Sequence, residues 1–196
     1  MLSLLRLRQI RVGLLTAVLL VVSACASHSG KSLNQQRQAI EEMRSQTLNN
    51  LYKTKPYAAD SIERAAGYAV FSNANLNLLF ASAGGGYGVV HANNGQVTYM
   101  KMGEVGLGLG LGAKDYRLVF VFHTHESLKR FVEQGWAFGG QLDAAAKAND
   151  KGDAIGGEIT VDNITIYQLT EAGLALQATI KGTKFWQDAE LNSNTN

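Results

Sequence analysis

The segment at residues 106–112 alternates strictly between glycine and leucine, and this alternation is the feature that most restricts the fold. Successive side chains of a β-strand point to opposite faces, so a strand here would carry only leucines on one face and only glycines on the other. A bare glycine face lets another element approach the backbone closely. The whole chain has 21 glycines and one proline, a balance typical of sheets with tight turns rather than of flexible linkers.

Short runs of β-branched and aromatic residues recur along the chain, and turn residues separate them. The strongest turn signal is Asn93-Asn94-Gly95, because an Asn-Gly pair accepts the positive φ that a tight hairpin needs. The predicted strands cover residues 67–71, 76–83, 88–92, 96–102, 106–112, 116–122, 136–141, 155–161, 164–169 and 174–180. So many short strands predict an α+β fold, in which an antiparallel β-barrel or curled sheet carries a few helices packed on one side or end.

Three segments have helical periodicity. The first helix is predicted at residues 33–52 and ends before Pro56. A second, short helix is expected to start at Asp60 or Ser61. The third is predicted at residues 124–134, and Gly135 ends it. We therefore expect one domain at residues 33–190, with the first helix at 33–52 and a strand-rich core at 67–186. Phe185 and Trp186 would close this core, and residues 191–196 would form a frayed tail.

The first predicted helix is amphipathic and lies in the most cationic part of the chain. Its apolar stripe consists of Leu33, Ile40, Met43, Thr47 and Leu51. Arginines beside such a stripe can bind lipid phosphates while the stripe enters the headgroup layer. Alternatively, the helix packs on its own domain, and the arginine stems cover apolar surface. The candidate lipid-binding residues are Arg37, Arg44, Lys53 and Lys55.

The N-terminus has the three parts of a secretory signal in the expected order. Arginines precede an apolar run at residues 12–22, which is shorter than the about 20 residues that cross a bilayer. Val22-Ser23-Ala24-Cys25 then resembles a bacterial lipobox, which implies cleavage after Ala24 and acylation of Cys25. The alternatives are an ordinary signal with an incidental cysteine, or an uncleaved membrane anchor. We expect a signal peptide at residues 1–24 and a lipidated tether at residues 25–32.

Processing changes both the location and the charge of the chain. Ala26 follows the cysteine, which by the sorting rule of enteric bacteria predicts a protein anchored at the periplasmic face of the outer membrane. The chain has 18 basic and 16 acidic residues, and the signal removes Arg6, Arg8 and Arg11. The mature protein is therefore not basic, which argues against a nucleic-acid partner.

The sequence offers little catalytic or metal-binding chemistry. Cys25 is the only cysteine, so no intramolecular disulfide can form. His123 and His125 could share a strand face, but two ligands without a third are weak evidence for a metal site. The glycine clusters at residues 84–88 and 106–112 lack the pattern of phosphate-binding or dinucleotide-binding loops, so sheet architecture explains them better. No catalytic motif or cofactor-binding motif is present.

Six segments, in this order, resemble the SYLF lipid-binding domain family, bacterial lipoprotein branch. They are residues 63–71 (ERAAGYAVF), 84–90 (GGGYGVV), 116–122 (YRLVFVF), 135–139 (GWAFG), 166–174 (IYQLTEAGL) and 181–184 (KGTK), and a helix at residues 127–133 adds to the likeness. The resemblance covers residues 48–186 and implies phospholipid binding without phosphoinositide specificity or an actin role. We therefore expect a non-catalytic, phospholipid-binding domain on a membrane-anchored periplasmic lipoprotein. The main alternative is a cell-envelope scaffold that binds another protein.

Overall fold

A computed structural model describes residues 32–79, 81–106, 110–138, 158–170, 173–174 and 183–193. The predicted signal peptide and Cys25 lie outside these ranges, as do residues 175–180 of the last predicted strand. The chain divides into two compact units, Met1–Gln35 and Gln36–Asn196. In the described end of the first unit, Ser32 Oγ accepts a bond from the Gln35 amide (3.3 Å) and Gln35 Oε1 accepts one from the Ser32 amide (2.8 Å). This reciprocal capping box starts the first described helix.

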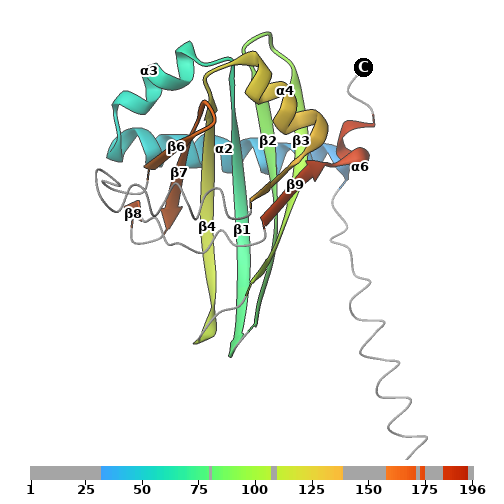
Figure 1. Cartoon of the computed structure of the whole chain (residues 1–196). Coiled ribbons are helices and arrows are strands. Elements are labelled where there is room, and N and C mark those ends of the chain that lie inside the picture. The colour runs from blue at the N-terminus through green and yellow to red at the C-terminus, as the bar shows by residue number, and fades with distance from the viewer. Residues whose placement is uncertain are drawn as a thin grey trace, which may run out of the picture. The chain divides into compact units, whose positions relative to one another are not determined.

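The described elements are four helices and nine strands (Figure 1). The helices are α2 (Leu33–Thr54), α3 (Tyr57–Arg64), α4 (His125–Gln134) and α6 (Ala189–Asn192). The strands are β1 (Gly67–Leu79), β2 (Ala81–Ala92), β3 (Val97–Gly106), β4 (Gly110–Phe122), β5 (Trp136–Phe138), β6 (Glu158–Val161), β7 (Ile164–Thr170), β8 (Gly173–Leu174) and β9 (Thr183–Gln187).

All described strands belong to one antiparallel sheet in the order β5-β9-β3-β2-β1-β4-β7-β6, with β8 beside β7. The predicted hairpin joins β2 to β3, and Gly95 there has φ 88°. Asp162 and Asn163 both have positive φ and make the tight turn from β6 to β7. Among the described strands β5 and β6 do not pair, so the sheet is curled rather than closed. The predicted α+β fold is confirmed in this form.

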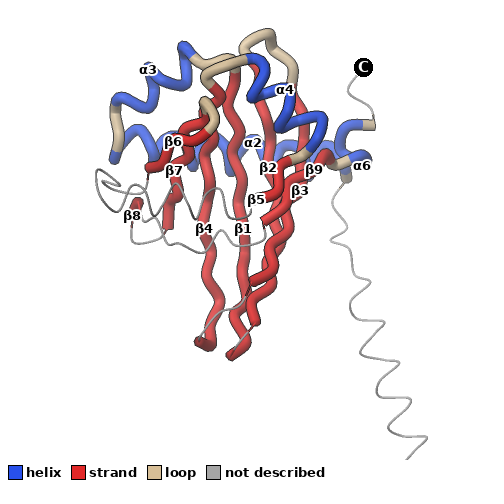
Figure 2. Tube along the Cα trace, viewed as in Figure 1, coloured by secondary structure: helices blue, strands red, loops and turns tan. Residues whose placement is uncertain are grey.

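The two faces of the sheet carry different helices (Figure 2). We call the face that packs against α4 the inner face and the face that α2 crosses the outer face. Thr124 caps α4 by accepting a bond from the Ser127 amide (3.2 Å), and Gly135 ends the helix at φ 65°. Both boundaries agree with the sequence prediction. The helix α2 buries Ile40, Met43, Thr47, Leu48 and Leu51.

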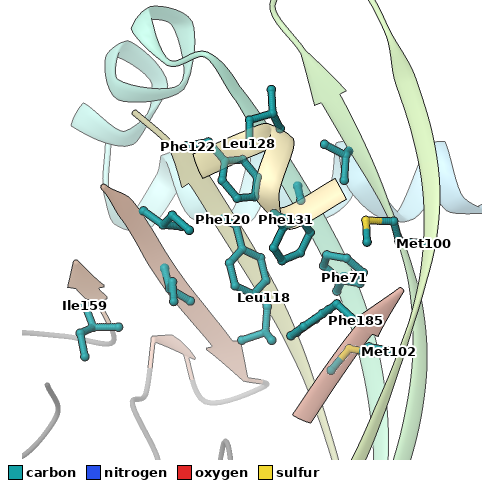
Figure 3. Close-up of a cluster of buried hydrophobic side chains, with 14 of the residues drawn as sticks. Phe71, Met100, Met102, Leu118, Phe120, Phe122, Leu128, Phe131, Ile159 and Phe185 are labelled. Carbon is teal, nitrogen blue, oxygen red and sulfur yellow. The ribbon is translucent and has the colours of Figure 1, made fainter. Parts of the chain in front are cut away.

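An aromatic cluster fills the inner face beneath α4 (Figure 3). Phe71 from β1 and Phe185 from β9 have ring centroids 4.8 Å apart, and Phe120 and Phe131 lie within 5.4 Å of each other. Each such pair contributes about 0.5–1.5 kcal/mol beyond the burial of its area. The aromatic rings join β1, β4 and β9 to α4, so this part of the interior is packed with side chains.

The glycine-rich segment at residues 84–88 lies within β2, between β1 and β3. A Cβ at Gly88 would lie 2.3 Å from Phe71 Cδ1 and 2.4 Å from the Val70 carbonyl oxygen. A Cβ at Gly86 would lie 2.2 Å from the Ser72 carbonyl oxygen. Only glycine fits where β1 and β2 approach so closely, which confirms that the cluster serves sheet architecture.

Several predicted boundaries were wrong. The helix α3 starts at Tyr57, directly after Pro56, because proline already holds the helical φ there (−56°). Residues 67–71 and the start of 76–83 belong to one long strand, β1, whose pairing with β2 and β4 outweighs its polar middle. The two ends of residues 106–112 belong to different strands, β3 and β4, so that segment is not a single strand.

The C-terminal predictions also need correction. Leu191, assigned to the frayed tail, is 4% exposed, and Asn192 Nδ2 donates to the Tyr99 carbonyl oxygen at 2.8 Å. These contacts hold α6 against β3. Phe185 closes the core as expected, but Trp186 is 40% exposed because it points to the outer face.

Candidate functional site

The amphipathic helix α2 packs its apolar stripe on the outer face of its own domain. Glu41 links the helix to β2, since its Oε2 accepts from Arg44 Nε (2.7 Å) and its Oε1 lies 3.0 Å from His91 Nε2. The His91 ring stacks on Tyr68 with centroids 5.5 Å apart. Arg117 of β4 donates to Thr47 Oγ1 at 3.0 Å. The described contacts thus agree with the alternative in which this helix packs on its own domain.

Both arginines of α2 contact the domain itself. Arg44 Nη1 donates to Tyr68 Oη at 2.9 Å. Burial lowers the pKa of Arg44, but its bonds to Glu41 and Tyr68 outweigh burial and raise it. Arg37 donates twice to the Leu191 carbonyl oxygen, at 3.0 and 2.7 Å, and lies 5.9 Å from the centroid of the Tyr99 ring. The arginines therefore fasten α2 to β1, β3 and α6.

The two predicted lysines are placed differently. Lys53 is exposed near the end of α2, whereas Lys55 Nζ lies 3.6 Å from Glu158 Oε2 and 5.5 Å from the centroid of the Tyr57 ring. Arg37, Arg44 and Lys55 contact separate elements and Lys53 is exposed, so the structure does not bring the four cations together in one site. Their role in lipid binding stays a prediction.

A second surface on the outer face was missed by the sequence prediction. Tyr87, Lys101 and Trp186 occupy directly paired positions on β2, β3 and β9. Lys184 lies two residues before Trp186 on β9, and we call these four residues the outer-face patch. Tyr87 and Trp186 are 45% and 40% exposed, and the Lys101 side chain is 45% exposed. Tyr57 is the other exposed large aromatic residue of the described chain, and it lies on α3.

Gly103 and Asp188 position the patch. A Cβ at Gly103 would lie 3.1 Å from Cη2 of Trp186, so the indole lies over the bare backbone of β3. Asp188, which is buried, caps α6 and holds Lys101 Nζ at 3.1 Å. Lys184 has no acidic partner among the described residues. The patch therefore combines two half-exposed aromatic rings with lysine ammonium groups.

The histidine pair does not form the metal site considered from sequence. His123 follows β4 and bonds Thr165 Oγ1 at 2.8 Å, whereas His125 is the first residue of α4, so the two do not share a strand face. Within the described residues, no group of three potential His, Cys, Asp or Glu ligands occurs. His125 instead lines a pocket of about 310 Å³ between α4 and the β2–β3 hairpin.

None of the described helices is long and apolar enough to span a bilayer. Cys25, the predicted acylation site, lies outside the described residues.

A curled antiparallel sheet with a packed aromatic interior and an exposed aromatic–lysine surface defines a domain of the α+β class. Residues 103–195 match the family model described as "Ysc84: Las17-binding protein actin regulator". Residues 103–195 therefore match the SYLF family, and the resemblance noted in the sequence is confirmed for this part of the chain. The family is generally a non-catalytic binding domain, known for lipid-related and actin-related binding.

A relative from Aeromonas veronii extends the similarity beyond residues 103–195. The chain is 32% identical over 168 residues to "Beta cell expansion factor A". The aligned region covers 84% of this chain and 62% of that relative, so the chain spans less than two thirds of the relative's length. The region includes most of the described sheet.

Proposed function

We propose that this chain is a non-catalytic phospholipid-binding lipoprotein whose domain contacts a bilayer through the outer-face patch. The exposure of Tyr87 and Trp186 carries the proposal. Tyrosine and tryptophan prefer the boundary between water and hydrocarbon, where the ring is apolar at one end and hydrated at the other. Lys101 and Lys184 stand beside these rings and would attract lipid phosphates.

The lipid anchor would make even a weak patch effective. Acylation of Cys25 would hold the domain at the periplasmic face of the outer membrane, as Ala26 predicts. Several acyl chains give stable anchoring, whereas one gives only marginal binding. An anchored domain meets the bilayer at a high effective concentration, so modest contacts through the patch would be occupied most of the time.

The alternative function is a cell-envelope scaffold that binds another protein through the same patch. Tyrosine and tryptophan are also the side chains that most often dominate protein interfaces, which is the observation in its favour. The two functions differ in the surface they need: a bilayer engages the patch without any second protein.

Vesicle flotation separates these functions. The Cys25→Ser full chain removes the anchor and leaves the described domain unchanged. We expect it to float with vesicles of phosphatidylglycerol and phosphatidylcholine at low salt, and to float less at high salt, because lysine–phosphate attraction is screened. A chain that stays unbound with every vesicle composition would favour the scaffold.

A further inference from the structure

Polar side chains follow the aromatic cluster on the inner face of the sheet. Asn73 on β1, Glu104 on β3, Tyr116 on β4 and Thr183 on β9 all face inward by strand alternation, and we call them the interior polar cluster. They are 2%, 5%, 9% and 0% exposed, respectively. Burying a carboxylate among neutral groups is costly unless it is paired with a positive charge.

Glu104 is the centre of this cluster. Its Oε2 accepts bonds from Tyr116 Oη and from Asn73 Nδ2, the latter at 3.0 Å. Burial, together with the hydrogen bond to Glu104, raises the pKa of Tyr116, so the phenol keeps its proton and donates it. Both partners are neutral, and no cation among the described side chains contacts Glu104. The described residues therefore leave its charge uncompensated.

The remaining oxygen atoms of the cluster have no hydrogen-bond donor among the described residues. Glu104 is an acceptor only, so Asn73 must present Nδ2 to it, and Asn73 Oδ1 is left without a partner. Thr183, which pairs directly with Glu104 across β3 and β9, has a buried Oγ1 without a partner. Glu104 Oε1 accepts no bond from the described residues. A buried polar group without a partner costs about 1–3 kcal/mol.

We propose that the interior polar cluster binds a primary ammonium group, either on an aminophospholipid headgroup or on a free amine. Three N–H donors match the three acceptors Asn73 Oδ1, Glu104 Oε1 and Thr183 Oγ1, and the positive charge compensates Glu104. Calcium takes six to eight oxygen ligands and magnesium demands six, so the three oxygens suit a metal ion less well. This inference does not rest on the outer-face patch, which lies on the opposite face.

Ligand titration of the Cys25→Ser full chain tests the site, with heat of binding and melting temperature as readouts. The probes are ethanolamine, dihexanoyl phosphatidylethanolamine and dihexanoyl phosphatidylcholine. We expect both primary amines, or the lipid alone, to bind and to raise the melting temperature. Phosphatidylcholine should not, because its quaternary ammonium has no N–H donor. Binding of ethanolamine identifies a free-amine site, and binding only of the phosphatidylethanolamine identifies a lipid headgroup site.

Substitutions assign the binding to the cluster. Glu104→Gln should weaken it at least tenfold, whereas Glu133→Gln, an exposed carboxylate on α4, should leave it unchanged. Thr183→Val keeps the side-chain shape and removes one acceptor, so it tests the site even if Glu104→Gln fails to fold. The proposal is overturned if neither amine binds, or if binding is equal in the wild type and in folded Glu104→Gln and Thr183→Val.

Discussion

The indole of Trp186 lies over Gly103 of the neighbouring strand, and the missing side chain of the glycine provides the space for the ring. This arrangement places the exposed tryptophan ring over β3, beside Lys101. Gly103 therefore shapes the outer-face patch, although it has no side chain that could contact a ligand.

Gly103→Val should therefore displace Trp186 and weaken vesicle binding severalfold. The Cβ alone would lie 3.1 Å from the ring, and the added methyl groups would enlarge the conflict. Tryptophan emission and vesicle flotation measure the two effects. Gly85→Val is the matched control, because a Cβ there meets only the Met102 carbonyl oxygen at 3.9 Å. Equal flotation of both variants would show that the position of the Trp186 ring over β3 does not affect vesicle binding.

Cys25→Ser should abolish acylation of the chain. The thiol is the group that would receive the lipid, and a hydroxyl does not replace it in this reaction. Mass spectrometry of the purified chain measures both cleavage and acyl mass, and fractionation measures location. Ser23→Thr, close in size and polarity, serves as a control for changes in the signal. A wild-type chain without acyl mass would contradict the lipobox interpretation.

Arg44→Gln should lower the free energy of unfolding by about 1 kcal/mol, the scale of one partly exposed charged hydrogen bond. The arginine joins Glu41 to Tyr68 and so fastens α2 to β1. Arg64→Gln, an exposed arginine on α3, should change stability by less than about 0.5 kcal/mol. Urea unfolding measures both. Vesicle binding that falls with Arg44→Gln in the folded state would restore the lipid-binding role of this helix.

Stability should fall as the pH rises above about 10, because two buried tyrosines hold their protons more tightly when folded. Burial raises the pKa of Tyr116 and of Tyr167 above the ordinary value of 10.0, with Glu104 and Glu158 adding to it, respectively. The folded state therefore favours the protonated tyrosines. Their contribution to the free energy of unfolding is complete below pH 10 and is lost as the pH rises above it. Urea unfolding from pH 8 to 11 should show a shallower decline for Tyr116→Phe than for Tyr87→Phe. Identical slopes would contradict the contribution of Tyr116.

Local periodicity was enough to predict much of the fold. The helix α4 could be predicted from the apolar face of its sequence and from Gly135 at its end, because both signals lie within the segment itself. The hairpin at Asn93-Asn94-Gly95 was equally local. Boundaries failed where pairing with distant strands decided them. Asn73, for example, lies between two predicted strands, but it belongs to β1 and is bonded within the core to Glu104.

The outer-face patch could not be predicted because it depends on the register between distant strands. Tyr87 stands among glycines and Trp186 beside Phe185, and the sequence alone does not show that β9 pairs with β3. Alternation within β9 did contain one usable signal: Phe185 and Trp186 are neighbours, so they point to opposite faces and cannot both close one core.

The most direct test of phospholipid binding through the outer-face patch is flotation of the unanchored Cys25→Ser chain carrying Tyr87→Ala and Trp186→Ala. Tyr57→Ala removes the exposed aromatic residue of α3 and is the matched control. We predict that the double variant, while folded, binds vesicles containing phosphatidylglycerol at least tenfold more weakly than the parent chain, and that Tyr57→Ala binds as the parent does. Unchanged binding of the double variant would contradict the proposed membrane contact.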